Sequence, residues 1–132
     1  MRPDEPRDAA YLWDMPDAAK AIRGFVAGRS YAEYLHDRML RGAVERHVEI
    51  IGEAAGKVSK TFREVHPEIQ WQQIVAQRHV LAHEYGDIEH ELLWGVATLH
   101  VPVLIVQLEA LVPHFPGIPT SLAPQLIYQL AL

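Results

Sequence analysis

The chain has 132 residues, of which 49% are hydrophobic and 22% charged, and its formal net charge is −5. This size and composition are typical of one soluble globular domain and exclude a disordered or fibrous chain. Because cysteine is absent, disulfides, iron–sulfur clusters, thiolate zinc sites and a cysteine nucleophile are excluded. The negative charge argues against a broad basic face for long nucleic acid, since that affinity comes mainly from Lys and Arg.

The N-terminal segment is charged and contains proline, since residues 1–7 read MRPDEPR. A signal peptide would need an apolar stretch of about 7–15 residues there. The most apolar stretch, residues 101–112, is too short to span a bilayer and carries Gln107 and Glu109. We therefore expect a cytoplasmic protein without a membrane partner.

The first predicted helix covers residues 8–27, where apolar residues recur at spacings of three, four and seven. Pro16 is expected to kink this helix or delay its start. Gly28 is expected to end it. Ser30 and Glu33 have the spacing of a capping box, which predicts that a new helix opens there.

The second predicted helix covers residues 34–58. A break in this helix around residues 36–38 is compatible with the pattern. Its apolar positions keep a period near 3.6. Gly52 and Gly56 are four residues apart, so they would share a face on which another helix approaches closely.

Two further helices are predicted after a short link at residues 59–66. Pro67 suits the first turn of a helix over residues 68–85, which Gly86 ends. Asp87 suits the N-cap of the last helix, over residues 88–111, in which Pro102 predicts a bend. The residues of this helix predicted to face the core are Leu92, Leu93, Val96, Leu99, Val103, Val106 and Ala110.

These elements predict an all-α fold, a bundle of four to five helices over residues 1–112. A proline-rich tail, residues 113–132, follows this domain, and the sequence assigns no role to it. Its apolar end is expected to pack on its own domain more readily than on a partner.

The segment at the end of the third long helix, residues 78–85, reads RHVLAHEY. It places a fixed cation (Arg78), an imidazole (His83) and a phenol (Tyr85) close together. In a regular helix Arg78 and Tyr85 share a face, whereas Arg78 and His83 diverge by about 140°. Joint action on one group therefore requires either a loosened helix near Gly86 or a composite site built from two protomers.

This segment resembles the Arg-x-x-x-x-His motif of HEPN ribonucleases, and specifically the Arg-x-x-x-x-His-x-Tyr form of the HepT toxins. Further stretches also look like HepT sequence: AVERHVEIIGEAAGKVS from residue 43, PEIQWQQI from residue 67, and residues 87–104 with Trp94 and Pro102. The resemblance covers residues 8–112 and implies a HEPN-like helical bundle.

The resemblance implies an endoribonuclease that needs no metal or other cofactor. A ribose 2′-hydroxyl would attack its own phosphate, with His83 as acid or base, Arg78 bound to the phosphate and His79 assisting. His83 suits this role because the reference pKa of histidine, about 6.5, leaves both protonation states available near neutral pH. A homodimer or larger assembly would supply two copies of each group.

The resemblance also implies a partner, a minimal nucleotidyltransferase antitoxin of a type VII-like toxin–antitoxin system. Some of these partners silence the toxin by attaching AMP to the motif tyrosine. Tyr85 is the matching acceptor, and a nucleotidyl group there would add bulk and negative charge beside Arg78 and His83.

Alternative interpretations remain at this point. Many family members have a small polar residue, often Asn, where this chain has His79, and His79 and His83 also have the spacing of two metal ligands. An Arg and a His on a helix are more often solvated or ion-paired than catalytic, and Trp13, Trp71 and Trp94 are more often core residues than base-stacking platforms. The alternative function is a catalytically silent binding module that dimerises and partners or regulates a nucleotidyltransferase.

Overall fold

The computed structural model describes residues 5–83 and 87–111, and the side chains of residues 8–77 and 90–111. These residues form helices and no strand, which confirms the predicted all-α fold. The predicted tail, residues 113–132, lies outside the described residues. The helices are α1 (Glu5–Val26), α2 (Tyr31–His36), α3 (Arg38–Lys57), α4 (Lys60–Val65), α5 (Trp71–His83), α6 (Asp87–Gly95), the π-helical turn η1 (Val96–His100) and α7 (Val101–Glu109).

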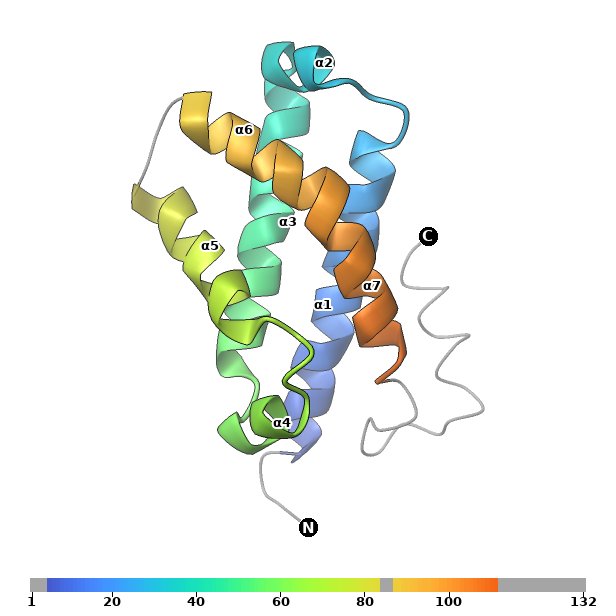
Figure 1. Ribbon diagram of the computed structural model, residues 1–132, viewed down its shortest axis with the longest axis vertical. Helices are drawn as coiled ribbons and strands as arrows, with labels where there is room; N and C mark the ends of the chain where they lie inside the picture. Colours follow the sequence, from blue (N-terminus) through green and yellow to red (C-terminus); the bar gives the residue numbers. More distant parts are fainter. Residues whose placement is uncertain (1–4, 84–86, 112–132) are drawn as a thin grey trace.

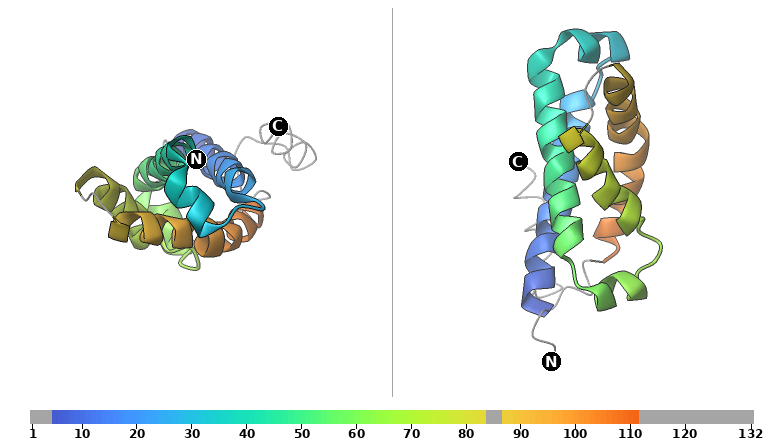
Figure 2. Two further views of the ribbon diagram at one scale, coloured as in Figure 1. Left: turned by 90° about the horizontal axis from the view of Figure 1, so that it is seen from above. Right: turned by 90° about the vertical axis from the view of Figure 1, so that its left-hand side faces the viewer.

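The long helices make up one bundle. Helices α1 and α3 run side by side along the long axis, α5 lies along α3, and α6, η1 and α7 form one rod that crosses over α1 and α3 (Figures 1 and 2). The short helices α2 and α4 close the two ends (Figure 1). The core lies between α1, α3 and the crossing rod, and its largest fully buried side chains include Leu12, Met15, Ile22, Tyr34, Val44, Ile105 and Leu108.

Local signals fix the connections near the α2 end of the bundle. Gly28 has a φ of 72°, a left-handed conformation that ends α1 at low cost. The predicted capping box is present: the Glu33 amide donates to Ser30 Oγ, and the Ser30 amide donates to Glu33 Oε1, both at 3.1 Å. Asp37 breaks the predicted second helix into α2 and α3, and it caps α3 by accepting from the Leu40 amide at 3.0 Å.

Two local expectations were wrong, and a third was wrong in part. Helix α1 begins at Glu5, so Pro16 does not delay its start; it is buried within the helix, and the alternative expectation of a kink there stays a prediction. The predicted link at residues 59–66 contains α4, which Ser59 caps through the Phe62 amide. Pro67 precedes α5 in a turn closed by the Ile69 amide and the His66 carbonyl at 3.3 Å, and proline suits the second position of such a turn.

Two polar contacts connect segments that are distant in sequence. Asp8, which is buried, accepts from the amide of Ser59 at 2.8 Å and from its hydroxyl at 2.6 Å, and so ties α1 to the start of α4. Lys20, only 8% exposed, lies 3.0 Å from a carboxylate oxygen of Glu109 on α7. Burial of an ammonium is costly unless it is paired, so this contact fixes α7 against α1.

The crossing rod is bent by a π-helical turn. Pro102 lacks an N–H, and its ring would clash with the Thr98 carbonyl in a regular α-helix. The chain avoids the clash by widening η1, where the Val101 amide donates to the Val96 carbonyl five residues back. The expected disturbance at Pro102 is therefore present, and it lies in the turn just before the proline.

The core face predicted for this rod was largely wrong. Leu93 and Val96 are buried as expected, but Leu92, Leu99, Val103 and Val106 are exposed. The buried positions after η1 are Val101, Leu104, Ile105, Leu108 and Leu111. Periodicity could not identify the inner face because residues 96–106 are apolar on both sides, and the π-turn then shifts the register.

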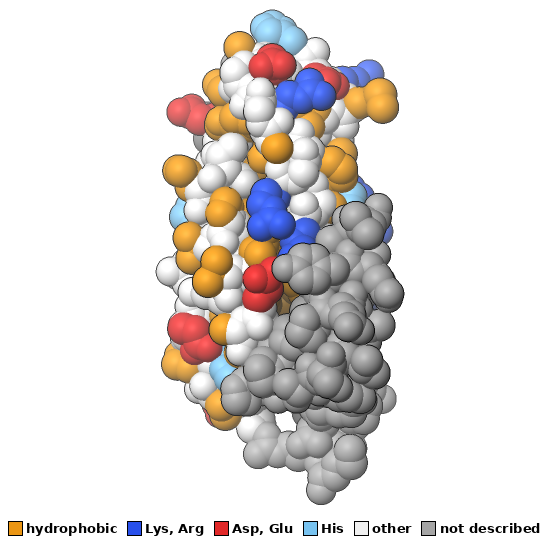
Figure 3. Space-filling view, turned by 90° about the vertical axis from the view of Figure 1, so that its right-hand side faces the viewer, with side chains coloured by type: hydrophobic (Ala, Val, Ile, Leu, Met, Phe, Trp, Pro, Cys, Tyr) orange, Lys and Arg blue, Asp and Glu red, His pale blue; other side chains and the backbone are white. Residues whose placement is uncertain are grey.

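The outer side of the rod consequently carries an exposed apolar stripe, which we define as Leu99, Val103 and Val106. These residues are spaced by four and three, so they share one helical face. The segment His90–Glu109 is long and apolar enough to cross a membrane by length and composition alone, but its inner side packs into the bundle. Figure 3 shows exposed hydrophobic side chains along one edge of the face that it draws.

Substitutions at two adjacent residues of α3, one buried and one exposed, test which residues belong to the core. Leu40 is 7% exposed and Met39 is 87% exposed. We expect Leu40→Ala to lower the free energy of unfolding by about 2–5 kcal/mol, because it removes buried methyl groups and leaves a cavity. Met39→Ala, the control, should change it by less than about 0.5 kcal/mol. Urea titrations followed by circular dichroism measure both, and equal effects would contradict this packing.

Candidate functional site

Helix α5 carries the candidate motif and is held to the bundle at its N-terminal half. The indole Nε1 of Trp71, a buried residue, donates to the His66 carbonyl at 2.9 Å. A Cβ added at Gly56 on α3 would lie 3.8 Å from Val75 Cγ2, an ordinary packing distance. Helix α5 is therefore the neighbour that faces Gly56, but it lies at a distance that would also admit a side chain, so the unusually close approach expected there is not observed. Trp71 is a core residue, as is expected for it.

The structure places the backbone of three predicted site residues on α5. Arg78, His79 and His83 all lie within this helix, which ends at His83. Their side chains, and the whole of Tyr85 and Gly86, lie outside the described residues. The predicted roles of Arg78, His79, His83 and Tyr85 therefore remain predictions.

The backbone geometry nevertheless constrains the motif. Helix α5 is α-helical through His83, so it does not loosen between Arg78 and His83. Five residues of regular α-helix correspond to a rise of about 7.5 Å and a rotation of about 140°. The loosening expected near Gly86 lies outside the described residues, whereas within the described helix Arg78 and His83 diverge, as the composite arrangement would require.

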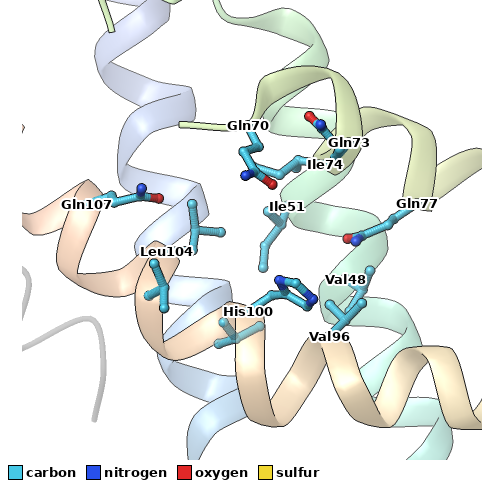
Figure 4. A pocket seen from close by; sticks show the side chains of 12 residues that line it. Val48, Ile51, Gln70, Gln73, Ile74, Gln77, Val96, His100, Leu104 and Gln107 are labelled. Atoms are coloured by element: carbon cyan, nitrogen blue, oxygen red, sulfur yellow. The ribbon is translucent and has the colours of Figure 1, made fainter. Parts of the chain in front are cut away.

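A pocket lies beside the same helix, between α5, α3 and the crossing rod (Figure 4). Its volume is about 230 Å³. Its inner wall is apolar and includes Ile51, Ile74 and Leu104, whereas its rim is polar. The polar lining residues are Gln70, Gln73 and Gln77 on α5, His100 on η1 and Gln107 on α7.

The polar groups of the pocket are available to a ligand. Figure 4 shows the amide of Gln77 and the ring of His100 extending toward the pocket from facing walls. Gln107 donates through Nε2 to the Glu68 carbonyl at 2.8 Å, which leaves its amide oxygen as an acceptor. Within the described part of the chain, no hydrogen bond occupies the side chains of Gln70, Gln73 or Gln77.

The pocket lining contains amides, an imidazole and apolar groups, but no Asp, Glu, Lys or Arg. It therefore suits a neutral ligand with donors and acceptors better than an isolated anion or cation. The carboxyl of Asp14, whose pKa is raised by burial and by the nearby Asp17, lies on α1 and does not line the pocket. No group of three His, Asp or Glu side chains that could hold a metal occurs among the described residues, which do not include the imidazoles of His79 and His83.

Sequence reasoning missed this pocket. One signal was present: Gln70, Gln73 and Gln77 are spaced by three and four on one helical face. The other walls come from helices α3 and α7, and their contribution depends on the register that the π-turn sets. No local pattern in the sequence could identify them.

Comparisons with known proteins identify the family. Residues 15–111 match the family described as ribonuclease HepT-like. A protein of Methanocaldococcus jannaschii that is named as a provisional RNase is 35% identical over 100 residues, which are 76% of this chain and 92% of that protein. A protein of Thermococcus cleftensis named a probable ribonuclease HepT is 33% identical over 101 residues, or 76% and 92% of the two chains. No solved structure gives a significant match.

These findings agree with the resemblance in the sequence and with the helical fold. The family match includes all of α3, α5, α6 and α7, together with the segment that carries Arg78 and His83. The predicted ribonuclease class is confirmed at the level of the family. This chain belongs to the HepT-like ribonuclease family of the HEPN superfamily.

Proposed function

We propose that this protein is a metal-independent endoribonuclease, the toxin of a type VII-like toxin–antitoxin system. The observation that carries the proposal is the position of Arg78 and His83 on one uninterrupted α-helix within the family match. The absence of a broad positive charge agrees with it, because a chain of net charge −5 must bind RNA locally. Exposed loops or single strands suit such binding better than long duplex does.

The reaction is an intramolecular transfer at phosphorus. The ribose 2′-oxygen attacks the adjacent phosphorus, the bond from phosphorus to the 5′-oxygen breaks, and a 2′,3′-cyclic phosphate forms. One imidazole accepts the 2′-hydroxyl proton and another group donates a proton to the leaving 5′-oxygen. His83 serves in these transfers with assistance from His79. Arg78 stabilises the phosphorane because it stays charged and forms two parallel hydrogen bonds to phosphate oxygens.

The first prediction concerns catalysis by Arg78 and His83. The purified protein should cleave single-stranded RNA in EDTA, and its products should end in 2′,3′-cyclic phosphate or 3′-phosphate. His83→Ala and Arg78→Ala should each lower kcat/KM by at least about 100-fold, the contribution typical of acid–base groups and charge stabilisation. End-labelled RNA and mass spectrometry of the fragments measure both effects.

Two results would contradict this chemistry. Loss of cleavage in EDTA with recovery on adding a divalent cation would favour His79 and His83 as metal ligands. Absence of cleavage by the native protein under all conditions would favour the silent binding module.

The proposed site is composite and requires a homodimer. Arg78 and His83 diverge around α5, so a second copy must bring a complementary set into the same cleft. The apolar stripe, Leu99, Val103 and Val106, supplies a face for that copy, since a soluble monomer rarely exposes a contiguous apolar face without a partner. The interface then follows α5 and the rod of α6, η1 and α7, and it is isologous.

The second prediction tests the dimer. Leu99→Arg combined with Val106→Arg places two charges in the proposed interface. We expect this variant to be a monomer by multi-angle light scattering at micromolar concentration and to lose RNA cleavage. Met39→Arg, at an even more exposed apolar position on α3, should remain a dimer and active. A monomeric variant that still cleaves RNA would refute the composite site.

Tyr85 is the proposed point of control by a nucleotidyltransferase partner. Its hydroxyl oxygen would attack the α-phosphorus of ATP, form a phosphodiester to AMP and release pyrophosphate, while the phenolic proton passes to a base on the partner. The added phosphate would compete with RNA for Arg78. A phenol with a reference pKa of about 10 is a poor proton carrier at pH 7, so Tyr85 regulates and does not catalyse.

The third prediction separates these roles of Tyr85. Tyr85→Phe should retain most of the RNA cleavage. The partner with ATP should silence the native protein but not Tyr85→Phe. Intact-protein mass spectra should show a mass increase of one AMP for the native protein alone. Equal silencing of both forms would mean that inhibition works by binding alone. A Tyr85→Phe protein as inactive as His83→Ala would place Tyr85 in the catalytic set.

A further inference from the structure

We propose that the glutamine-rimmed pocket between α3, α5 and the crossing rod binds one base of the RNA substrate, with adenine preferred. The proposal deepens the proposed function, on which it rests, by assigning a base-recognition subsite beside the cleavage motif. The pocket residues that carry it are Gln70, Gln73 and Gln77, with His100 and Gln107 opposite.

The chemistry of the lining favours a base over the other parts of RNA. A phosphate would need a cation, and none of the residues that line the pocket is Lys or Arg. A ribose alone would not use the apolar wall of Ile51, Ile74 and Leu104. A base matches both features, because its faces are apolar and its edge carries donors and acceptors.

The size of the pocket also limits the ligand. Pockets for drug-sized molecules measure roughly 300–1,000 Å³, and this pocket measures about 230 Å³. It therefore suits a single ring system and not a dinucleotide.

Among the bases, adenine is the one whose edge matches the donor and the acceptor of a glutamine amide best. A glutamine amide donates to N7 and accepts from the N6 amino group of adenine in one bidentate contact. Gln77, which Figure 4 shows extending into the pocket, is placed for such a contact. Gln107 keeps a free amide oxygen because its nitrogen is held by the Glu68 carbonyl, and so it favours a ligand that offers an N–H donor.

The position of the pocket connects it to the motif. Gln77 immediately precedes Arg78 on α5, and His83 lies six positions further along the helix, a rise of about 9 Å along the helix axis. Val103 belongs to both the pocket lining and the apolar stripe, so the pocket lies at the edge of the proposed dimer interface, next to the composite cleft.

The test uses the full-length protein and neutral nucleosides, which measure base binding without a phosphate and without cleavage. Adenosine should shift the side-chain amide signals of the pocket glutamines in nitrogen–proton correlation spectra, and guanosine, cytidine and uridine should shift them less. Gln77→Leu should weaken adenosine binding about tenfold, equivalent to about 1.4 kcal/mol. Gln72→Leu is the matched control, because Gln72 is exposed on the same helix and does not line the pocket.

A second arm uses single-stranded RNA with one adenosine moved along an otherwise constant sequence. The native protein and Gln72→Leu should place their cuts at a fixed distance from the adenosine, and Gln77→Leu should lose that preference through a higher KM. Adenosine that binds with equal affinity to native protein and Gln77→Leu, or cleavage indifferent to base identity, would overturn the subsite. If adenosine binding depends on Gln77 while the native protein cleaves no RNA, the pocket stands and the proposed cleavage fails.

Discussion

Pro102 sets the register of the longest apolar segment in the chain. Without an N–H at this position, the preceding turn widens into a π-helix, and every residue beyond it is rotated relative to a regular helix. The rotation places Leu104, Ile105 and Leu108 in the core and leaves the apolar stripe outside. His100, the last residue of the widened turn, lines the pocket. Core, stripe and pocket therefore all depend on one missing hydrogen-bond donor.

Local chemistry explains which parts of the fold could be predicted. Some features depend only on residues a few positions apart, so a short sequence pattern is enough to predict them. These are the left-handed Gly28, the capping box at Ser30 and the helix break at Asp37. The inner face of the crossing rod was predicted wrongly because apolar residues occupy both of its faces, and only packing against α1 and α3 selects one. The turn at Pro67 was missed because proline suits both a turn and a first helical turn.

The candidate site also has one part that could be predicted from the sequence and another that could not. The positions of Arg78 and His83 on one helix follow from the sequence, and the structure confirms a helix there. In the proposed composite site their joint action would require a second chain, which no pattern within one chain specifies. The pocket draws its walls from α3, α5 and α7, so it exists only once the bundle is packed. Helix α5 connects the two features, since its glutamine face borders the pocket and its last turns carry the motif.

The pairing of Lys20 with Glu109 has a consequence for synthesis of the protein on the ribosome. The two residues are 89 positions apart in the chain, and they join the first long helix to the last. Elongation proceeds at about 5–20 residues per second. Several seconds therefore pass between the synthesis of α1 and that of α7, which covers the inner face of α1. The bundle therefore closes only after α7 has been synthesised. A nascent chain that stops before residue 96 lacks the pocket wall that η1 and α7 supply, and it lacks the outer stripe, so the folded bundle and its pocket can form only after the crossing rod has been synthesised.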